Sequence, residues 1–219
     1  MALTWTASAR RLGMVSAVGT VLLTAVYAAT LGAGLLSLQS PQEPIGDPWF
    51  SILEIVIILT MPPMVALMVA VHAWAHAEAK VFSLMALVFV SLLAGLTCSV
   101  HFMILALGHQ AEFSGPAWMP LFLSFKWPSV PYAFDILAWD VFFALSVLFA
   151  ARAFGGSRLA NWIRALLVAS GALALAGLSG IIVGDMRLRM IGVVGYVGVF
   201  FAVALLLAIL FHRATPREA

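Results

Sequence analysis

The sequence predicts an all-α integral membrane protein, a single domain over residues 1–219 that folds as a bundle of six transmembrane helices. Composition is the first reason, because hydrophobic residues make up 64% of the chain and charged residues only 9%, whereas soluble domains contain about 25% charged residues. Length is the second reason, because six apolar stretches each reach the roughly 20 residues that a helix needs to cross the hydrocarbon core.

The first three helices are predicted at residues 12–38, 49–77 and 81–108. Arg10 and Arg11 precede the first helix, as they would in a signal peptide. Its apolar run is longer than that of a cleaved signal peptide, so we expect an uncleaved signal anchor.

Prolines mark the second helix and the longest connection. Pro62 and Pro63 lie at the centre of the second helix and predict a kink there, because proline lacks the amide hydrogen that the helix needs. In the connection 109–131, four prolines exclude one continuous helix. Trp118 and Trp127 are typical of the membrane interface, so we expect part of this connection to lie against the membrane.

The last three helices are predicted at residues 132–154, 159–183 and 188–212, separated by short glycine-containing turns. Three helices carry small residues at intervals of three or four, which permits close approach of helices and oligomerisation through these faces. The small residues are Thr20, Thr24, Ala28 and Gly32, then Ala172, Ala176, Gly180 and Gly184, and finally Gly192, Gly195 and Gly198.

The lysines and arginines predict the orientation. With the N-terminus inside, eight of the eleven would lie on the cytoplasmic side, as the positive-inside rule requires. Both termini are therefore predicted to be cytoplasmic, in what we expect to be a bacterial cytoplasmic membrane. The exceptions are Lys126, Arg187 and Arg189.

This topology places Glu54, His101 and Asp140 at similar depths in the outer half of the membrane. Counted at 1.5 Å per residue, Glu54 lies about 7 Å below that face, and His101 and Asp140 lie about 12 Å below it. An ionised side chain at mid-membrane costs about 2.5–3.5 kcal/mol, so Asp140 requires a partner. His101 matches its depth best, with Arg187 and Arg189 as the alternatives.

The leading hypothesis is a His–carboxylate pocket that binds or transforms a small amphipathic or lipid-like molecule by proton transfer, isomerisation or hydrolysis. His101, Asp140 and Glu54 are the candidate catalytic residues. Asp140 would orient His101, His101 would act as general acid and base, and Glu54 would be a second proton donor or acceptor. The candidate ligand-binding residues are Asp135, His109, Trp139, Tyr132, Arg187 and Arg189.

Three alternatives stay open. The first is a proton- or ion-coupled transporter with the carboxylates as a relay and the two prolines as a hinge. The second is a metal site built from Glu54, His101 and Asp140, with or without His109. The third is a scaffold subunit whose charges hold helices together. The sequence assigns no cofactor, and the expected partners are the lipid bilayer and an amphipathic ligand rather than nucleic acid, because the net charge is only +2.

Overall fold

Six helical spans cross the length of the molecule. The computed structural model describes residues 5–40, 43–108, 110, 115 and 117–216. In these residues, six spans are long and apolar enough to cross a membrane and no strand is formed, which confirms the predicted fold class. The spans are Ala7–Leu36, Trp49–Trp74, Ala77–Leu107, Val130–Ala153, Arg158–Val183 and Met186–Arg213.

The first three spans are nearly continuous helices, whereas the fourth and sixth spans change helix type along their length and the fifth is interrupted at Leu178. The first three consist of α1 (Ala7–Leu36), α2 (Trp49–Trp74), and η1 (Ala77–Ala79) with α3 (Lys80–Leu107). A short helix, α4 (Pro120–Leu123), lies in the connection to the fourth span, which contains α5 (Val130–Ile136), η3 (Leu137–Phe143), α6 (Ala144–Ala150) and η4 (Ala151–Ala153). The fifth span contains α7 (Arg158–Gly177) and α8 (Ser179–Val183), and the sixth contains η5 (Met186–Arg189), α9 (Met190–Val193), η6 (Val194–Val199) and α10 (Phe200–Arg213).

The first helix begins five residues earlier than predicted. Thr6 caps it, because its hydroxyl oxygen accepts a hydrogen bond from the amide of Ala9, and a side-chain acceptor at this position satisfies an amide that the helix leaves free. The helix therefore includes Arg10, whose guanidinium donates hydrogen bonds to the carbonyls of Phe211 and His212. These bonds hold the start of α1 against the end of α10.

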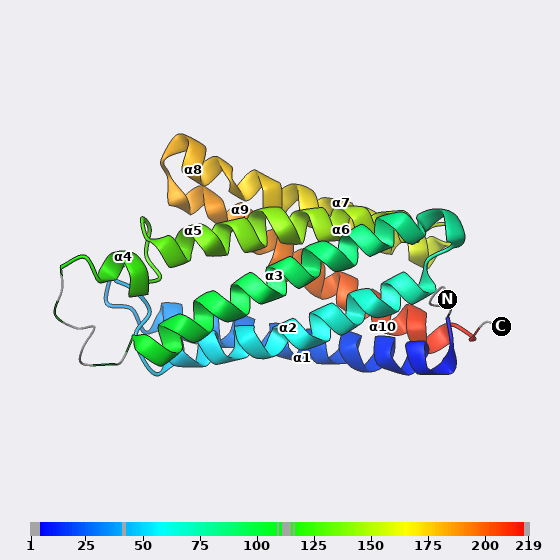
Figure 1. Ribbon diagram of the computed structural model, residues 1–219, viewed down its shortest axis with the longest axis horizontal. Coiled ribbons are helices and arrows are strands. Elements are labelled where there is room, and N and C mark those ends of the chain that lie inside the picture. Colours follow the sequence, from blue (N-terminus) through cyan, green and yellow to red (C-terminus); the bar gives the residue numbers. More distant parts are fainter. Residues whose placement is uncertain (1–4, 41–42, 109, 111–114, 116, 217–219) are drawn as a thin grey trace.

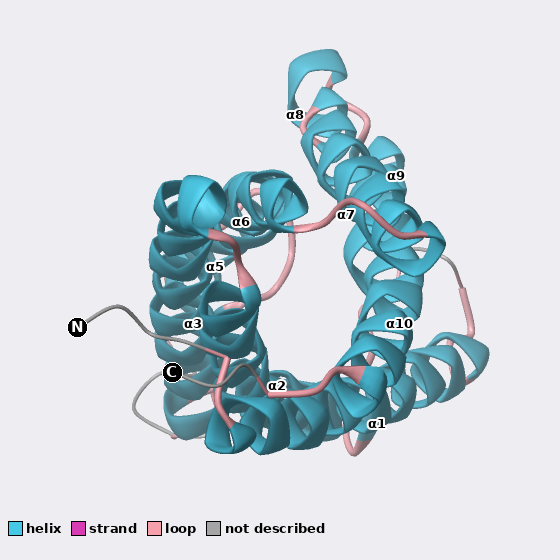
Figure 2. Ribbon diagram, turned by 90° about the vertical axis from the view of Figure 1, so that its right-hand side faces the viewer, coloured by secondary structure: helices cyan, strands magenta, loops and turns pink. Residues whose placement is uncertain are grey.

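The spans form a closed ring in chain order (Figure 2). Each span packs against the next one, and α10 of the sixth span packs against α1. Both termini lie at one end of the bundle, and α4 lies at the opposite end (Figure 1). We call these the termini end and the α4 end.

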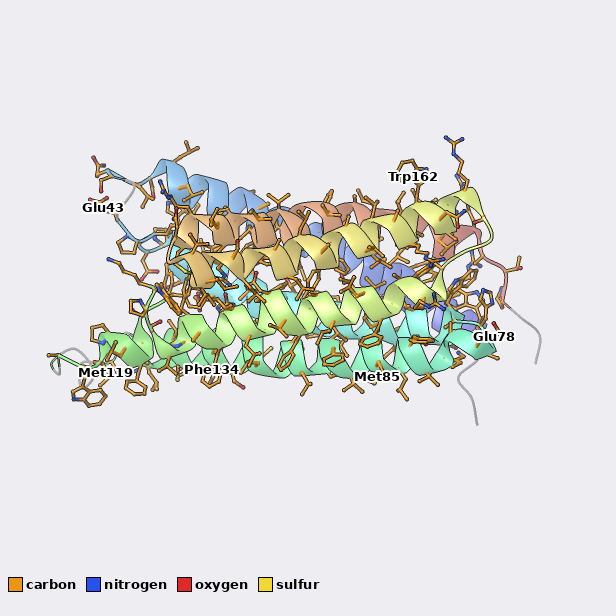
Figure 3. All side chains as sticks on the ribbon, turned by 90° about the horizontal axis from the view of Figure 1, so that it is seen from above. Glu43, Glu78, Met85, Met119, Phe134 and Trp162 are labelled. Atoms are coloured by element: carbon orange, nitrogen blue, oxygen red, sulfur yellow. The ribbon has the colours of Figure 1, made fainter. Side chains whose placement is uncertain are left out.

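Large apolar side chains cover the outside of the ring, as lipid contact requires. Met85, Phe134 and Trp162 are exposed and lie on the outer faces of three different spans (Figure 3). Inside, the part of the bundle nearer the termini end is filled by apolar residues. The largest buried ones there are Trp5, Met68, Leu67, Leu207 and Phe211.

Glycines allow the fifth and sixth spans to approach each other closely. A side chain at Gly177 or Gly192 would collide with the carboxylate of Asp140. Of the predicted small-residue face of the fifth span, Gly180 is buried inside the bundle whereas Ala172 and Ala176 are exposed, so oligomerisation through this face stays a prediction. The face of the fifth span that packs inside the bundle includes Gly177, and the absence of a side chain there leaves room for the carboxylate of Asp140.

The second span passes through Pro62 and Pro63 as one helix. A hydroxyl on this helix, that of Thr60, donates a hydrogen bond to the carbonyl of Val56 one turn earlier. The kink at the two prolines stays a prediction.

Candidate functional site

Five ionisable side chains are buried together in the half of the bundle nearer the α4 end. They come from four spans, and each is at most 7% exposed. Because a buried charge is costly without a partner, their mutual contacts decide how the site is built. The five, which we call the ionic cluster, are Glu54 on α2, His101 on α3, Asp135 on α5, Asp140 on η3 and Arg189 on η5.

The ionic cluster is a chain of alternating acidic and basic groups. Oε2 of Glu54 lies 2.8 Å from Nδ1 of His101, and Nε2 of the same ring lies 3.4 Å from Oδ1 of Asp135. The guanidinium of Arg189 then joins two carboxylates: Nη2 donates to Oδ2 of Asp135, and Nε donates to Oδ2 of Asp140 at 3.2 Å. Three carboxylates thus share one permanent cation and one imidazole.

A turn at the α4 end directs Arg189 into the bundle. Gly184 ends the fifth span with a positive φ of 77°, a conformation that glycine adopts without steric cost. The carboxylate of Asp185 next accepts a hydrogen bond from the amide of Arg187 and so starts η5. Gly180 lets the backbone of Arg189 pass closely, since an added Cβ would lie 3.2 Å from the Arg189 amide nitrogen.

The start of the fourth span is fixed in a similar way. Ser129 caps α5 by accepting a hydrogen bond from the amide of Tyr132, and Pro131 occupies the first turn, where no amide donor is needed. Asp135 then faces the interior one turn later. The next segment, η3, is π-helical and buries both Trp139 and Asp140.

Aromatic rings line the ionic cluster on the side of the α4 end. The guanidinium carbon of Arg189 lies 4.6 Å from the centre of the Tyr132 ring, a cation–π contact. Phe125 lies against both His101 and Tyr132, with ring centroids 5.1 and 5.3 Å apart. The apolar ring surface beside these charges lowers the local dielectric constant, which strengthens the electrostatic interactions between them.

Two cavities meet at the ionic cluster. The central cavity, of about 220 Å³, lies inside the bundle, and His101, Asp135 and Arg189 form its polar wall. Its other walls are mostly apolar and come from α1, α2 and the fourth and sixth spans. They include Tyr27, Leu31, Leu35, Ile57, Met64, Trp139, Met190, Val193, Tyr196, Val197 and Phe200.

The second cavity, of about 470 Å³, lies nearer the α4 end, and we call it the α4-end cavity. Glu54, His101 and Arg189 contribute charged or titratable groups to it, together with Lys126 from the connection after α4. His101 and Arg189 therefore line both cavities, whereas Asp135 lines only the central one and Glu54 only the α4-end one.

Exposed residues of the first and sixth spans contribute to the lining of the central cavity. Leu35 of α1 and Met190 of α9 line it while being 52% and 53% exposed. α1 packs against α10 but makes little or no contact with α9 and η6. The cavity therefore borders half-exposed side chains where α1 and α9 lie apart near the α4 end.

Two π-helical segments line the central cavity from facing spans. Trp139 belongs to η3 and Tyr196 to η6, and their ring centroids are 5.1 Å apart. π-helical turns are rare and frequently occur at functional sites. The indole nitrogen of Trp139 is buried and has no hydrogen-bond partner in the described residues, and the same holds for Oδ1 of Asp140.

The prediction that His101 is the partner of Asp140 was wrong. Its hydrogen-bond partner is Arg189, while His101 contacts Glu54 and Asp135 instead. Depth along the helices predicts a similar level for Glu54, His101 and Asp140, but it does not give the positions of these residues in the membrane plane. The long side chain of Arg189, one of the two alternative partners predicted from the sequence, reaches Asp140 from the sixth span.

The other predicted site residues lie in different environments. Tyr132 and Trp139 line the cavities, as described above. Arg187 is exposed and pairs with Asp185 at 2.8 Å, outside the ionic cluster. Its side-chain and backbone donors hold the pKa of the Asp185 carboxyl below its usual value. His109 lies outside the described residues.

The predicted metal alternative is not supported by the geometry. In the part of the chain that the structure describes, no three His, Cys, Asp or Glu side chains are placed to hold one metal ion. Glu54 and His101 are in contact, but Asp140 is bound to the guanidinium of Arg189. A cation at this position would be repelled by that arginine.

Three aromatic residues of the site were not predicted from the sequence, namely Tyr27, Phe125 and Tyr196. Phe125 was assigned only to a membrane-apposed connection, yet it lines both cavities. Nothing in the local pattern distinguishes these residues from the many aromatic side chains that face lipid.

Comparisons of the chain with protein-family models, with curated proteins and with solved structures found no match.

Proposed function

We propose that the central cavity binds a small amphipathic, lipid-like molecule. The observation that carries this proposal is the division of the cavity wall. One side presents His101, Asp135 and Arg189, and the rest is mostly apolar. A ligand with a polar group and an apolar body matches such a wall, since ligand sites are commonly apolar with a few placed polar groups.

The exposed lining residues Leu35 and Met190 support the entry of a ligand from the bilayer. A molecule dissolved in the membrane could pass between Leu35 and Met190 without crossing water. The charges also support a functional role, because ionisable residues inside a membrane are costly and commonly mark binding sites or proton pathways. The ion pairs would hold four spans together as well, so the scaffold alternative needs a direct test.

The transporter alternative has less support. Between the ionic cluster and the termini end, the described interior consists mainly of apolar side chains such as Met68, Leu207 and Phe211. A transported ion or proton would need polar groups along this half. The arrangement therefore favours a site that opens toward the α4 end and the bilayer.

Photo-cross-linking tests the proposal. A small diazirine-bearing residue is placed at Val193, which lines the central cavity, or at the adjacent Val194, which is 55% exposed on the outer face. After irradiation in native membranes, mass spectrometry identifies the adducts. We expect a defined small molecule at Val193 and bulk phospholipids at Val194. Bulk phospholipids at both positions, or only adducts within the protein at Val193, would favour a scaffold.

A further inference from the structure

His101 is held by a carboxylate at each ring nitrogen. Glu54 lies at Nδ1 and Asp135 at Nε2, and all three side chains are buried. A neutral imidazole carries one N–H and can donate to only one of the two carboxylates. Two hydrogen bonds therefore require one further proton, on the ring or on one of the two carboxyl groups.

The sites available to this proton extend from one cavity to the other. Glu54 lines the α4-end cavity, Asp135 lines the central cavity, and His101 lines both. The ring of Phe125 packs against the imidazole of His101 and lines both cavities, so it lies beside the polar groups at the place where the two cavities meet. The three polar groups thus provide a continuous path for a proton between the two cavities.

We propose that Glu54, His101 and Asp135 form a proton relay between the α4-end cavity and the central cavity. The relay rests on the proposed function and deepens it. Asp135 would exchange the proton with the polar group of the molecule bound in the central cavity. It also changes the predicted roles: Asp135, rather than Asp140, is the carboxylate that works with His101 at the central cavity.

One transfer conserves atoms and charge. The proton on Oε2 of Glu54 moves to Nδ1 of His101, while the proton on Nε2 moves to Oδ1 of Asp135. One O–H and one N–H bond break, and one N–H and one O–H bond form. Glu54 becomes a carboxylate, Asp135 becomes a carboxylic acid, and the ring changes tautomer without a change of net charge. The reverse transfer restores the starting state.

Other charged and titratable groups face the relay. Arg189 from η5 binds Asp135 and Asp140, and the Tyr132 ring lies against its guanidinium. Tyr27 of α1 lines both cavities, and Lys126 lines the α4-end cavity. Any pH-dependent signal from the relay has to be assigned by substitution, because these groups lie close to it.

Infrared spectroscopy of the full chain in phosphatidylcholine nanodiscs tests the relay. After a rapid change of pH, the carboxyl signal of Asp135 is followed in time and assigned by its loss in Asp135→Asn. We expect Glu54→Gln and His101→Gln to slow this signal about tenfold or more, because a positioned proton donor contributes factors of this size or larger. Glu43→Gln is the control, since Glu43 lies at the same end but outside both cavities. Equal rates in the unmodified protein and in the Glu54→Gln, His101→Gln and Glu43→Gln variants would overturn the relay.

Nuclear magnetic resonance of the unmodified chain with ¹⁵N-labelled histidine gives a second measurement that does not depend on the folding of the variants. We expect both ring nitrogens of His101 to be hydrogen bonded. A free ring nitrogen would overturn the relay. Neither measurement uses a ligand, so the two proposals can fail separately. The relay can be overturned while a defined small molecule is cross-linked at Val193, and the relay can be found while no such molecule is cross-linked there.

Discussion

Nε of Arg189 donates a hydrogen bond to Oδ2 of Asp140 over 3.2 Å and so joins the sixth span to the fourth inside the ring. The same guanidinium binds Asp135 through Nη2. One arginine therefore compensates two carboxylates that come from different turns of one span. Removing it leaves both acids buried without their cation, whereas removing Asp140 leaves Arg189 with one partner.

A double-mutant cycle tests this relationship. We expect Arg189→Gln to destabilise the detergent-solubilised protein by about 3–5 kcal/mol, the usual cost of breaking a buried ion pair, and Asp140→Asn to cost less. The double mutant should cost less than the sum of the two, because the groups interact directly. Unfolding of the four proteins measures the coupling. Additive effects of Arg189→Gln and Asp140→Asn would show that the bond does not contribute.

The glycines around Asp140 give a second prediction. Gly177→Ala and Gly192→Ala should each destabilise the bundle by about 1–3 kcal/mol, because the added methyl group collides with the Asp140 carboxylate. Gly198→Ala is the matched control, since an added Cβ there meets no atom within 4 Å. Thermal unfolding measures all three. A loss of stability at Gly198→Ala equal to that at Gly192→Ala would contradict the close approach as the cause, because helix propensity favours alanine over glycine at both positions.

A third prediction concerns a hydrogen bond between spans. The buried hydroxyl of Ser146 donates to the carbonyl of Ala86 on α3 at 2.8 Å. Ser146→Ala should cost about 0.6 kcal/mol, the average for such bonds in membrane bundles. Ser91→Ala provides the comparison, because its exposed hydroxyl donates to Leu87 within its own helix. Equal stabilities of the two variants would contradict a contribution from the interhelix bond.

Topology gives a fourth prediction. In a Cys98→Ser background, Gly46→Cys and Gly155→Cys form a matched pair, because an added side chain meets open space at either position. A membrane-impermeant thiol reagent added outside the cell should label Gly46→Cys alone, since the positive-inside rule places the turn at Gly155 in the cytoplasm. Labelling of Gly155→Cys alone would reverse the orientation, and labelling of both would contradict the six-span path.

The sequence by itself determined the architecture and pointed to three residues of the ionic cluster, Glu54, His101 and Asp140. Apolar stretches of transmembrane length fix the spans, because backbone polar groups in a bilayer must be satisfied within a helix. The cost of a buried charge singled out Asp140, and counting along the helices brought Glu54 and His101 to a similar depth. These inferences depend on position along one axis only, and a one-dimensional pattern carries that information.

Tertiary structure alone decided which groups meet. The ring order of the spans places Asp135 beside His101, and the turn at Gly184 and Asp185 directs Arg189 between Asp135 and Asp140. Pairing in the membrane plane depends on the rotation of each helix and on side-chain reach. These properties arise from packing over the whole bundle, and for that reason the partner of Asp140, the lining aromatic rings and the two cavities could not be obtained from the sequence.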